Sequence, residues 1–139
     1  MNKIMEIEIV VNGKLEEDDV VSLYKANGWS SAEKPKKLMA ALNGSDTVVS
    51  ANYQHKLVGL CNSLTDGSLV VYYPHLLVHP NYHRKGIGKK MMEAMHYIYK
   101  DFHQQILVAD GKAINFYRSL GFSRAGKSEP MWIYQGNEH

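Results

Sequence analysis

A strand, a tight turn and the start of a helix follow one another in Leu76-Leu77-Val78-His79-Pro80-Asn81-Tyr82-His83-Arg84-Lys85-Gly86-Ile87-Gly88-Lys89-Lys90. The three successive apolar residues 76–78 are typical of a strand that is covered on both faces. Pro80 and Asn81 predict the turn that ends this strand. Apolar residues then recur at helical spacing, so we expect a helix to begin near Gly88. These residues are Ile87, Met91, Met92, Met95 and Ile98.

The loop that leads into this helix has the composition of an anion site. A helix start presents unpaired backbone N–H groups and the positive end of the helix dipole, and glycines let a phosphate approach those groups. Cations are unfavourable at a helix start unless an anion lies between them. We therefore predict a site for phosphate or pyrophosphate; the alternative is a solvated turn. The cations are Arg84, Lys85, Lys89 and Lys90.

Two motifs carry a family resemblance. The loop His83-Arg84-Lys85-Gly86-Ile87-Gly88 resembles the Arg/Gln-x-x-Gly-x-Gly/Ala loop with which GCN5-related N-acetyltransferases (GNAT) grip the pyrophosphate of acetyl-coenzyme A. Downstream, Ala113-Ile114-Asn115-Phe116-Tyr117-Arg118-Ser119-Leu120-Gly121-Phe122 resembles the family's Ala-x-x-Phe-Tyr-x-x-Leu-Gly-Phe helix. Both motifs occur in the usual order and at the usual separation. The resemblance extends over residues 57–123, and His83 departs from it because Arg or Gln is usual there.

The pattern of elements predicts one α/β domain over residues 1–139. Hydrophobic periodicity and turn residues give a strand, two helices, three strands, a helix, a strand, a helix and a last strand. The expected ranges are Ile4–Val11, Leu15–Asn27, Pro35–Leu42, Thr47–Ala51, Leu57–Leu64, Ser68–Val78, Gly88 to about Lys100, Gln105–Ala109, Lys112–Leu120 and Met131–Tyr134. Pro74 predicts a bulge or irregularity in its strand.

This order is similar to the acyl-CoA N-acyltransferase fold, a mixed central sheet flanked by helices. The resemblance implies that the fourth and fifth strands, Ser68–His79 and Gln105–Ala109, splay apart to admit the cofactor. Backbone groups left unpaired by the splay need a partner when they are buried. The resemblance implies that the amides of the pantetheine arm supply it, with backbone contacts from Leu76, Leu77 and Val78.

The resemblance further implies acetyl-CoA as cosubstrate, with no metal. The residues expected to hold its pyrophosphate are His83, Arg84, Lys85, Gly86, Ile87, Gly88 and Lys89. Asp110 stands where many relatives have an asparagine that contacts the cofactor, although helix N-capping is its alternative role. Asn115, within the helix, could contact the cofactor as well.

Tyr117 and His75 are the candidate catalytic residues. By resemblance Tyr117 faces the cofactor thiol, and its phenol could protonate the departing thiolate; the alternative is a core aromatic. His75 precedes Leu76 on the strand beside the acetyl group, and an imidazole of pKa near 6.5 suits a general base. A hydrogen-bonded strand histidine is the alternative there.

Three further sets of residues carry weaker functional signals. His75, His79 and His83 are spaced by four, but Pro74 and Pro80 argue against a helical metal face. Cys61 is expected in the core instead of acting as a nucleophile. Trp29 is expected either to line the acceptor pocket or to fill the core.

The predicted activity is direct transfer of acetyl from acetyl-CoA to a primary amine, preferably of a small molecule. A catalytically silent coenzyme A-binding or sensing module is the first alternative. A nucleic-acid binder is the second, but a net charge of +2 does not favour it. The single cysteine and the lack of a long apolar run predict a cytoplasmic protein without membrane contact. A homodimer is compatible with the sequence.

Overall fold

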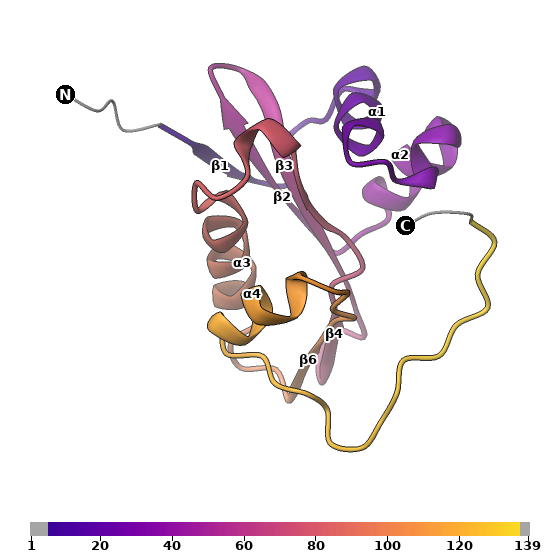
Figure 1. Ribbon diagram of the computed structural model, residues 1–139, viewed down its shortest axis with the longest axis vertical. Helices are drawn as coiled ribbons and strands as arrows, with labels where there is room; N and C mark the ends of the chain where they lie inside the picture. The colour runs from indigo at the N-terminus through magenta and orange to yellow at the C-terminus, as the bar shows by residue number, and fades with distance from the viewer. Residues whose placement is uncertain (1–5, 137–139) are drawn as a thin grey trace.

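The computed structural model describes residues 6–136, which form a mixed sheet with helices on both faces (Figure 1). The strands follow the order β1-β2-β3-β4-β6, and β5 pairs with β3. The strands are β1 (Glu8–Val11), β2 (Thr47–Tyr53), β3 (Lys56–Thr65), β4 (Val70–Tyr72), β5 (Leu76–Val78) and β6 (Gln104–Ile106). The helices are α1 (Glu17–Ala26), α2 (Pro35–Asn43), α3 (Ile87–Ile98) and α4 (Ala113–Ser119), with 3₁₀ turns η1 (Ser30–Glu33) and η2 (Pro80–Tyr82).

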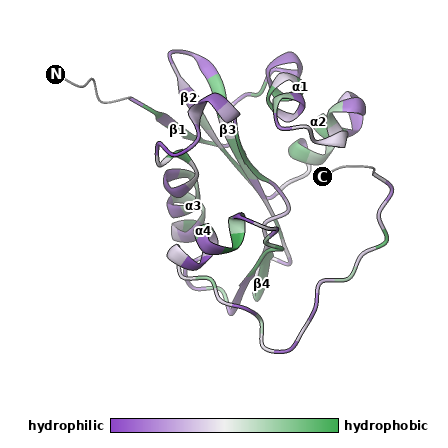
Figure 2. Cartoon of the chain, viewed as in Figure 1, coloured by the Kyte–Doolittle hydropathy of each residue, from purple (hydrophilic) through white to green (hydrophobic). Residues whose placement is uncertain are grey.

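Two apolar clusters hold the layers together, one on each face of the sheet. On one face α1 and α2 bury their apolar sides against Leu57 and Leu60 of β3, and on the other α3 packs against Val49 and Cys61. Polar and apolar residues alternate along these helices, as Figure 2 shows. Buried helix residues are Val20, Leu23, Tyr24, Leu38 and Leu42 on the first face and Ile87, Met91, Met92 and Met95 on the second.

Gly59 allows α3 to approach the sheet closely. A Cβ at this position would lie 2.9 Å from the Cε of Met91 and 3.2 Å from Ile87. The periodicity that predicts α3 is therefore confirmed, and its apolar stripe is seated on β3. This contact fixes where the N-terminus of α3 lies relative to the sheet.

The predicted single strand Ser68–Val78 is two strands, β4 and β5, separated by a bulge at Pro74. Leu64 of β3 pairs with Tyr72, and Cys61 pairs with Leu76. Three steps along β3 therefore correspond to four steps along the opposite chain. The extra residue lies between Tyr72 and Leu76, because proline cannot donate a ladder hydrogen bond. The prediction of an irregularity at Pro74 is confirmed, and that of one continuous strand is wrong.

The splay between the fourth and fifth predicted strands is present. β4 and β6 are parallel partners, and the N–H of Tyr73 donates the last bond of this ladder to the carbonyl of Ile106 at 3.0 Å. Beyond it, residues 107–109 leave the ladder, so the predicted strand Gln105–Ala109 ends at Ile106. Within residues 6–136, β5 pairs with β3 on one side, and its other side opens on the gap.

The predicted last strand, Met131–Tyr134, is wrong. These residues join no ladder, and the side chains of Met131 and Ile133 are 93% and 96% exposed. Figure 1 shows the segment arcing away from the sheet. Strand-forming side chains make a strand only where a neighbouring main chain pairs with them, and residues 131–134 lie beside none.

The remaining predicted elements are confirmed with small shifts at their ends. The first strand begins at Glu8, and residues 4 and 5 of its predicted range lie outside the described residues. The hairpin turn between β2 and β3 places Gln54 and His55 at φ of 48° and 66°. Within residues 6–136, no helix has the length and apolarity needed to cross a membrane.

Candidate acetyl-CoA site

The predicted anion loop lies at the N-terminus of α3. Gly86 caps the helix in the left-handed conformation, with φ of 79°, and Arg84 has φ of 62°. The first backbone bond of the helix runs from the N–H of Lys90 to the carbonyl of Gly86, at 3.1 Å. Earlier amides of a helix lie beyond the reach of its own carbonyls. The N–H groups of Ile87, Gly88 and Lys89 are thus available to an anion.

The cationic side chains around this helix start are solvent-exposed. Arg84, Lys85, Lys89 and Lys90 are all exposed, and Lys89 lies 4.0 Å from Glu93 on the next turn. An exposed pair of this kind contributes little to stability. These side chains therefore add positive charge around the open amides without closing the approach to them.

His83 ties the loop to β5. Its Nε2 lies 2.7 Å from the carbonyl oxygen of Val78. Since a carbonyl only accepts, Nε2 carries the hydrogen, and the imidazole is committed to the protein main chain. His83 thus holds the loop against β5, and its contact with the pyrophosphate stays a prediction.

Two loop residues act through packing. The side chain of Ile87 is buried, so it can meet an anion only through its N–H. At Gly88 a Cβ would lie 3.1 Å from the Cζ of Phe116 on α4. Gly88 therefore brings α4, and with it Tyr117, close to the anion loop.

The main chain of β5 presents alternate residues to the gap. The carbonyl of His75 accepts from Asn62, and the N–H of His79 donates to Val58 at 2.8 Å, so odd-numbered residues face β3. In an antiparallel pair, successive residues point their N–H and C=O groups alternately toward the partner strand and away from it. Leu76 and Val78 thus direct their N–H groups into the gap. The prediction for Leu77 is corrected, because its main chain faces β3.

Tyr117 lies on α4 in a half-buried aromatic cluster. Its ring centroid is 5.2 Å from that of Phe116 and 5.9 Å from that of Phe122. Burial, with a smaller contribution from the thiol of Cys61, raises the pKa of Tyr117 to about 12. Cys61 is the ladder partner of Leu76 on β5.

His75 occupies the bulge and is clamped by Asn62. Its N–H donates to the Oδ1 of Asn62 at 3.0 Å, and its carbonyl accepts from the N–H of Asn62 at 3.2 Å. Its ring lies 5.2 Å from that of Trp29 and 5.4 Å from that of Tyr24, between centroids. Its Nδ1 is 2.8 Å from the phenol oxygen of Tyr24. The general-base role stays a prediction, and it requires that Nε2 carry a lone pair.

Sequence reasoning missed Tyr24 and Asn62 as partners of His75. Tyr24 was visible only as an apolar position of α1, and no motif marks Asn62. Both contacts arise because the bulge turns His75 toward α1, which residue spacing alone does not reveal. Trp29, expected as pocket wall or core filler, packs against Tyr24 at 5.5 Å between ring centroids and also against His75.

Two predicted cofactor contacts lie on the surface at α4. Asp110 and Asn115 are exposed. The carbonyl of Asp110 accepts from the N–H of Ala113 at 3.0 Å, but the N-cap residue of α4 is Lys112, without a side-chain cap. The alternative of N-capping by Asp110 is therefore wrong. Cofactor contact by either residue stays a prediction.

The remaining candidates lie in unrelated surroundings. Cys61 is fully buried, and burial raises the pKa of its thiol to about 12, as expected of a core residue. His79 accepts at Nδ1 from the N–H of Asn81, whereas His75 and His83 bond to Tyr24 and Val78. The three histidines thus point to different partners.

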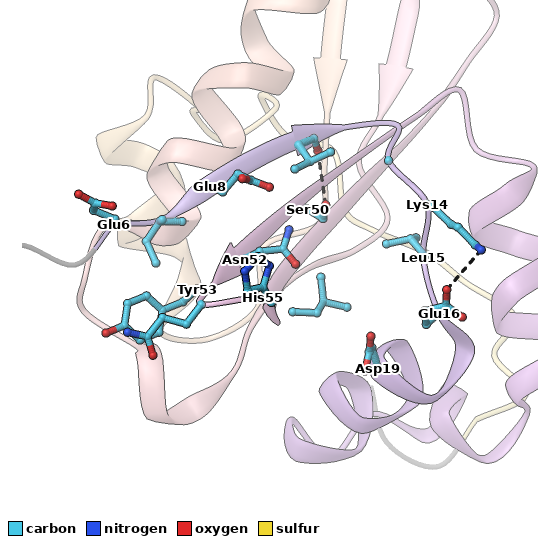
Figure 3. Close-up of a pocket in the computed structure, with 15 residues that line it drawn as sticks. Glu6, Glu8, Lys14, Leu15, Glu16, Asp19, Ser50, Asn52, Tyr53 and His55 are labelled. Atoms are coloured by element: carbon cyan, nitrogen blue, oxygen red, sulfur yellow. Dashed lines mark hydrogen bonds and ion pairs between the residues drawn. The ribbon is translucent and has the colours of Figure 1, made fainter.

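A pocket of about 890 Å³ lies elsewhere, between β1, β2 and the start of α1 (Figure 3). Its lining includes the carboxylates Glu6, Glu8, Glu16 and Asp19, and Lys14 pairs with Glu16 at 3.5 Å. None of the predicted site residues lines it. The predicted site residues lie instead on the loop before α3 and its first turn, on or next to β5, and on or just before α4.

The chain is similar to known acetyltransferases in sequence and in structure. The acetyltransferase (GNAT) domain family matches residues 44–124. A GNAT-family acetyltransferase from Streptococcus pneumoniae superposes with a TM-score of 0.82 at 30% identity, over 94% of this chain and 99% of that one.

Two curated relatives are longer than the aligned region. An uncharacterised N-acetyltransferase, ycf52, of Gracilaria tenuistipitata var. liui is 27% identical over 86% of this chain and 68% of its own length. A soybean (Glycine max) histone acetyltransferase, TAP1, is 30% identical over 79% of this chain. The chain spans about half of that soybean relative, 53%.

Proposed function

Because the chain belongs to the GNAT acetyltransferase family, we propose that it transfers acetyl from acetyl-CoA directly to a primary amine of a small molecule. The observation that carries this proposal is the convergence of the α3 N-terminus, the open side of β5 and Tyr117 at one gap. The family uses acetyl-CoA, and the residues at the gap fit it.

In this proposal the cofactor follows the gap. Its pyrophosphate binds the N–H groups of residues 87–89, where the helix dipole favours an anion. The pantetheine amides pair with the main chain of Leu76 and Val78. One of these N–H groups would polarise the thioester carbonyl and stabilise the oxyanion that forms on it. Asp110 and Asn115 are proposed as outer contacts.

The reaction needs a neutral amine. At pH 7 an amine of pKa about 10.4 is neutral only about 0.04% of the time, which costs about 4.6 kcal/mol. Its nitrogen attacks the thioester carbon, the C–S bond breaks, and the sulfur leaves as a thiolate. Tyr117 then supplies a proton to that thiolate, and His75 contacts the acceptor side. The ammonium proton leaves to a side chain or through water before the attack, and the second N–H proton, lost as the amide forms, returns through water to the phenolate of Tyr117.

The difference between the pKa of the Tyr117 phenol and that of the coenzyme A thiol is larger than the ordinary values of the two groups imply. A free thiol has a pKa of about 8.5, and the pKa of Tyr117 is raised to about 12. Proton transfer from the phenol is therefore uphill until the site compensates electrostatically. The phenol nevertheless stays protonated at neutral pH, so it is available as a general acid in every enzyme molecule.

We also propose that the protein works in the cytoplasm. The support is that Cys61, the single cysteine, is buried as a thiol, which suits a reducing compartment. A protein amine is the competing acceptor class, since one relative is named a histone acetyltransferase.

An acceptor screen tests the proposal. Acetyl-CoA would be mixed with amino sugars, polyamines, aminoglycosides, aryl alkylamines and a histone H3 N-terminal peptide, and release of free thiol followed. The expected result is acceptor-dependent release with one small-amine class. Release with the peptide alone would overturn the acceptor class. Calorimetric binding of acetyl-CoA with no release in any mixture would favour a silent coenzyme A-binding module.

A further inference from the structure

The hydrogen bond between Tyr24 and His75 has a determinable direction. The side chain of Tyr24 is 0% exposed, and its oxygen lies 2.8 Å from Nδ1 of His75. Within residues 6–136, this nitrogen is the hydrogen-bond partner of the phenol. Burial raises the pKa of Tyr24 above its ordinary value, so the phenol keeps its hydrogen.

A buried hydroxyl that fails to donate loses its hydrogen bond to water without replacement. If Nδ1 of His75 carried a hydrogen, two donors would face each other and the phenol hydrogen would have to turn away from its partner. The favoured arrangement therefore has Tyr24 donating and Nδ1 accepting. A neutral imidazole has one donor and one acceptor nitrogen, so Nε2 carries the hydrogen.

The ring of His75 is held in this orientation. Asn62 fixes its main chain through two hydrogen bonds. Tyr24 and Trp29 pack edge-to-face against the ring from α1 and the residue before η1. Turning the imidazole over would place a carbon opposite the buried phenol.

We propose that Tyr24 is a positioning residue that locks His75 in the Nε2–H tautomer, so that Nε2 is a hydrogen-bond donor and has no lone pair with which to take the proton of an amine. The inference rests on the proposed function and deepens it. The amine proton then passes to water, R–NH₃⁺ + H₂O giving R–NH₂ + H₃O⁺, before the nitrogen attacks. The general-base expectation for His75 is replaced by a donor role.

Nitrogen-15 NMR of the full chain tests the tautomer without any ligand. Long-range proton–nitrogen spectra distinguish protonated from unprotonated ring nitrogens, and the His75 signals are those missing from His75→Gln among the seven histidines. The expected result at neutral pH is an unprotonated Nδ1 and a protonated Nε2. A protonated Nδ1 in the unmodified chain would overturn the proposal, and the result is independent of any turnover.

Two matched variants assign the effect to Tyr24. Tyr24→Phe removes the phenol oxygen and should give a mixture of tautomers. Tyr73→Phe removes another buried phenol, which donates to the Oε1 of Gln105 and makes no hydrogen bond to His75 in the described chain. It should leave the His75 spectrum unchanged. An unchanged tautomer in Tyr24→Phe would mean that Tyr24 does not set it.

Turnover with the amine identified by the screen supplies a second readout. The amide N–H of glutamine can replace the Nε2–H donor, so His75→Gln should lose less turnover than a variant that has no donor at this position. His75→Leu should lose up to about tenfold, the scale of one neutral hydrogen bond. Equal losses of about 10²-fold or more in both variants would indicate a general base and overturn the donor role.

Discussion

Tyr117 holds its proton at every physiological pH, because burial raises the pKa of its phenol to about 12. Tyr117→Phe removes one oxygen and keeps the ring contacts with Phe116 and Phe122. Turnover should fall by about 10²–10³-fold, the scale for a positioned acid, while acetyl-CoA affinity changes little. The measurement is steady-state thiol release together with calorimetry.

An activated donor provides the control for Tyr117→Phe. A thioester whose thiol has a lower pKa needs less protonation on leaving, so it should recover part of the lost rate. Normal turnover of the variant with acetyl-CoA would mean that Tyr117 serves packing and that water protonates the thiolate.

Substitutions at Gly86 and Lys85 distinguish the contribution of backbone N–H groups to anion binding from that of side-chain charge. Gly86 has φ of 79°, where a residue with a Cβ is strained by about 1–2 kcal/mol. Gly86→Val should weaken acetyl-CoA binding by roughly 5–30-fold. Lys85→Ala removes an exposed charge, worth at most about 1 kcal/mol or roughly fivefold. Calorimetry giving the reverse order would indicate a site based on charge alone.

Tyr99, directly after α3, anchors that helix to the sheet. Its buried phenol donates to Asp46 and lies 2.6 Å from Ser63 Oγ and 2.8 Å from Thr47 Oγ1. Tyr99→Phe leaves these groups short of a partner and should lower the free energy of unfolding by about 1–3 kcal/mol. Urea unfolding followed by circular dichroism measures it. Tyr97→Phe, on an exposed residue of the same helix, is the control and should change stability little.

At the scale of elements, hydrophobic periodicity predicted the helices and strands whose formation depends on the local sequence. The stripe from Ile87 to Met95 and the turn residues around β2 and β3 were sufficient, because they specify burial and turns within one segment. Met131–Tyr134 failed for the opposite reason: strand pairing depends on a distant main chain. The division of Ser68–Val78 was partly visible, since Pro74 marked the bulge but not its effect on register.

In the candidate site, too, the features set by local sequence were predicted and those set by tertiary packing were not. The loop at Gly86 and the helix of Tyr117 were found because each is a contiguous motif. The direction of the Leu77 main chain and the phenol of Tyr24 beside His75 depend on how β5 pairs with β3 and where α1 packs. Neither is encoded in spacing along the chain.

At the scale of the molecule, buried protonated groups set the alkaline limit of stability. Burial raises the pKa of Cys61 and of Tyr117 to about 12 each, from ordinary values of 9.0 and 10.0. Above pH 9 the unfolded chain loses these protons first, so it binds fewer protons than the folded chain and stability falls as pH rises. This stability is fully present below pH 9 and is lost progressively up to about pH 12.

Urea unfolding at half-unit steps from pH 7 to pH 11 checks this expectation. The midpoint should be flat with respect to these groups up to pH 9 and decline above it. Cys61→Ala should delay the onset of the decline toward pH 10, where tyrosines of the unfolded chain begin to titrate. A decline with the same onset in Cys61→Ala would assign it to other groups.

The bulge at Pro74 sets the phase of the strand that follows it. Without the extra residue, the register of Leu64 with Tyr72 would continue along β3. The main chains of residues 76 and 78 would then point at β3, and those of 75, 77 and 79 at the gap. A single inserted residue therefore selects which amides a thioester can meet, while the hydrophobic pattern of the strand stays the same. In a chain redesigned for another acyl donor, the length of this bulge is a variable independent of every side chain in the gap.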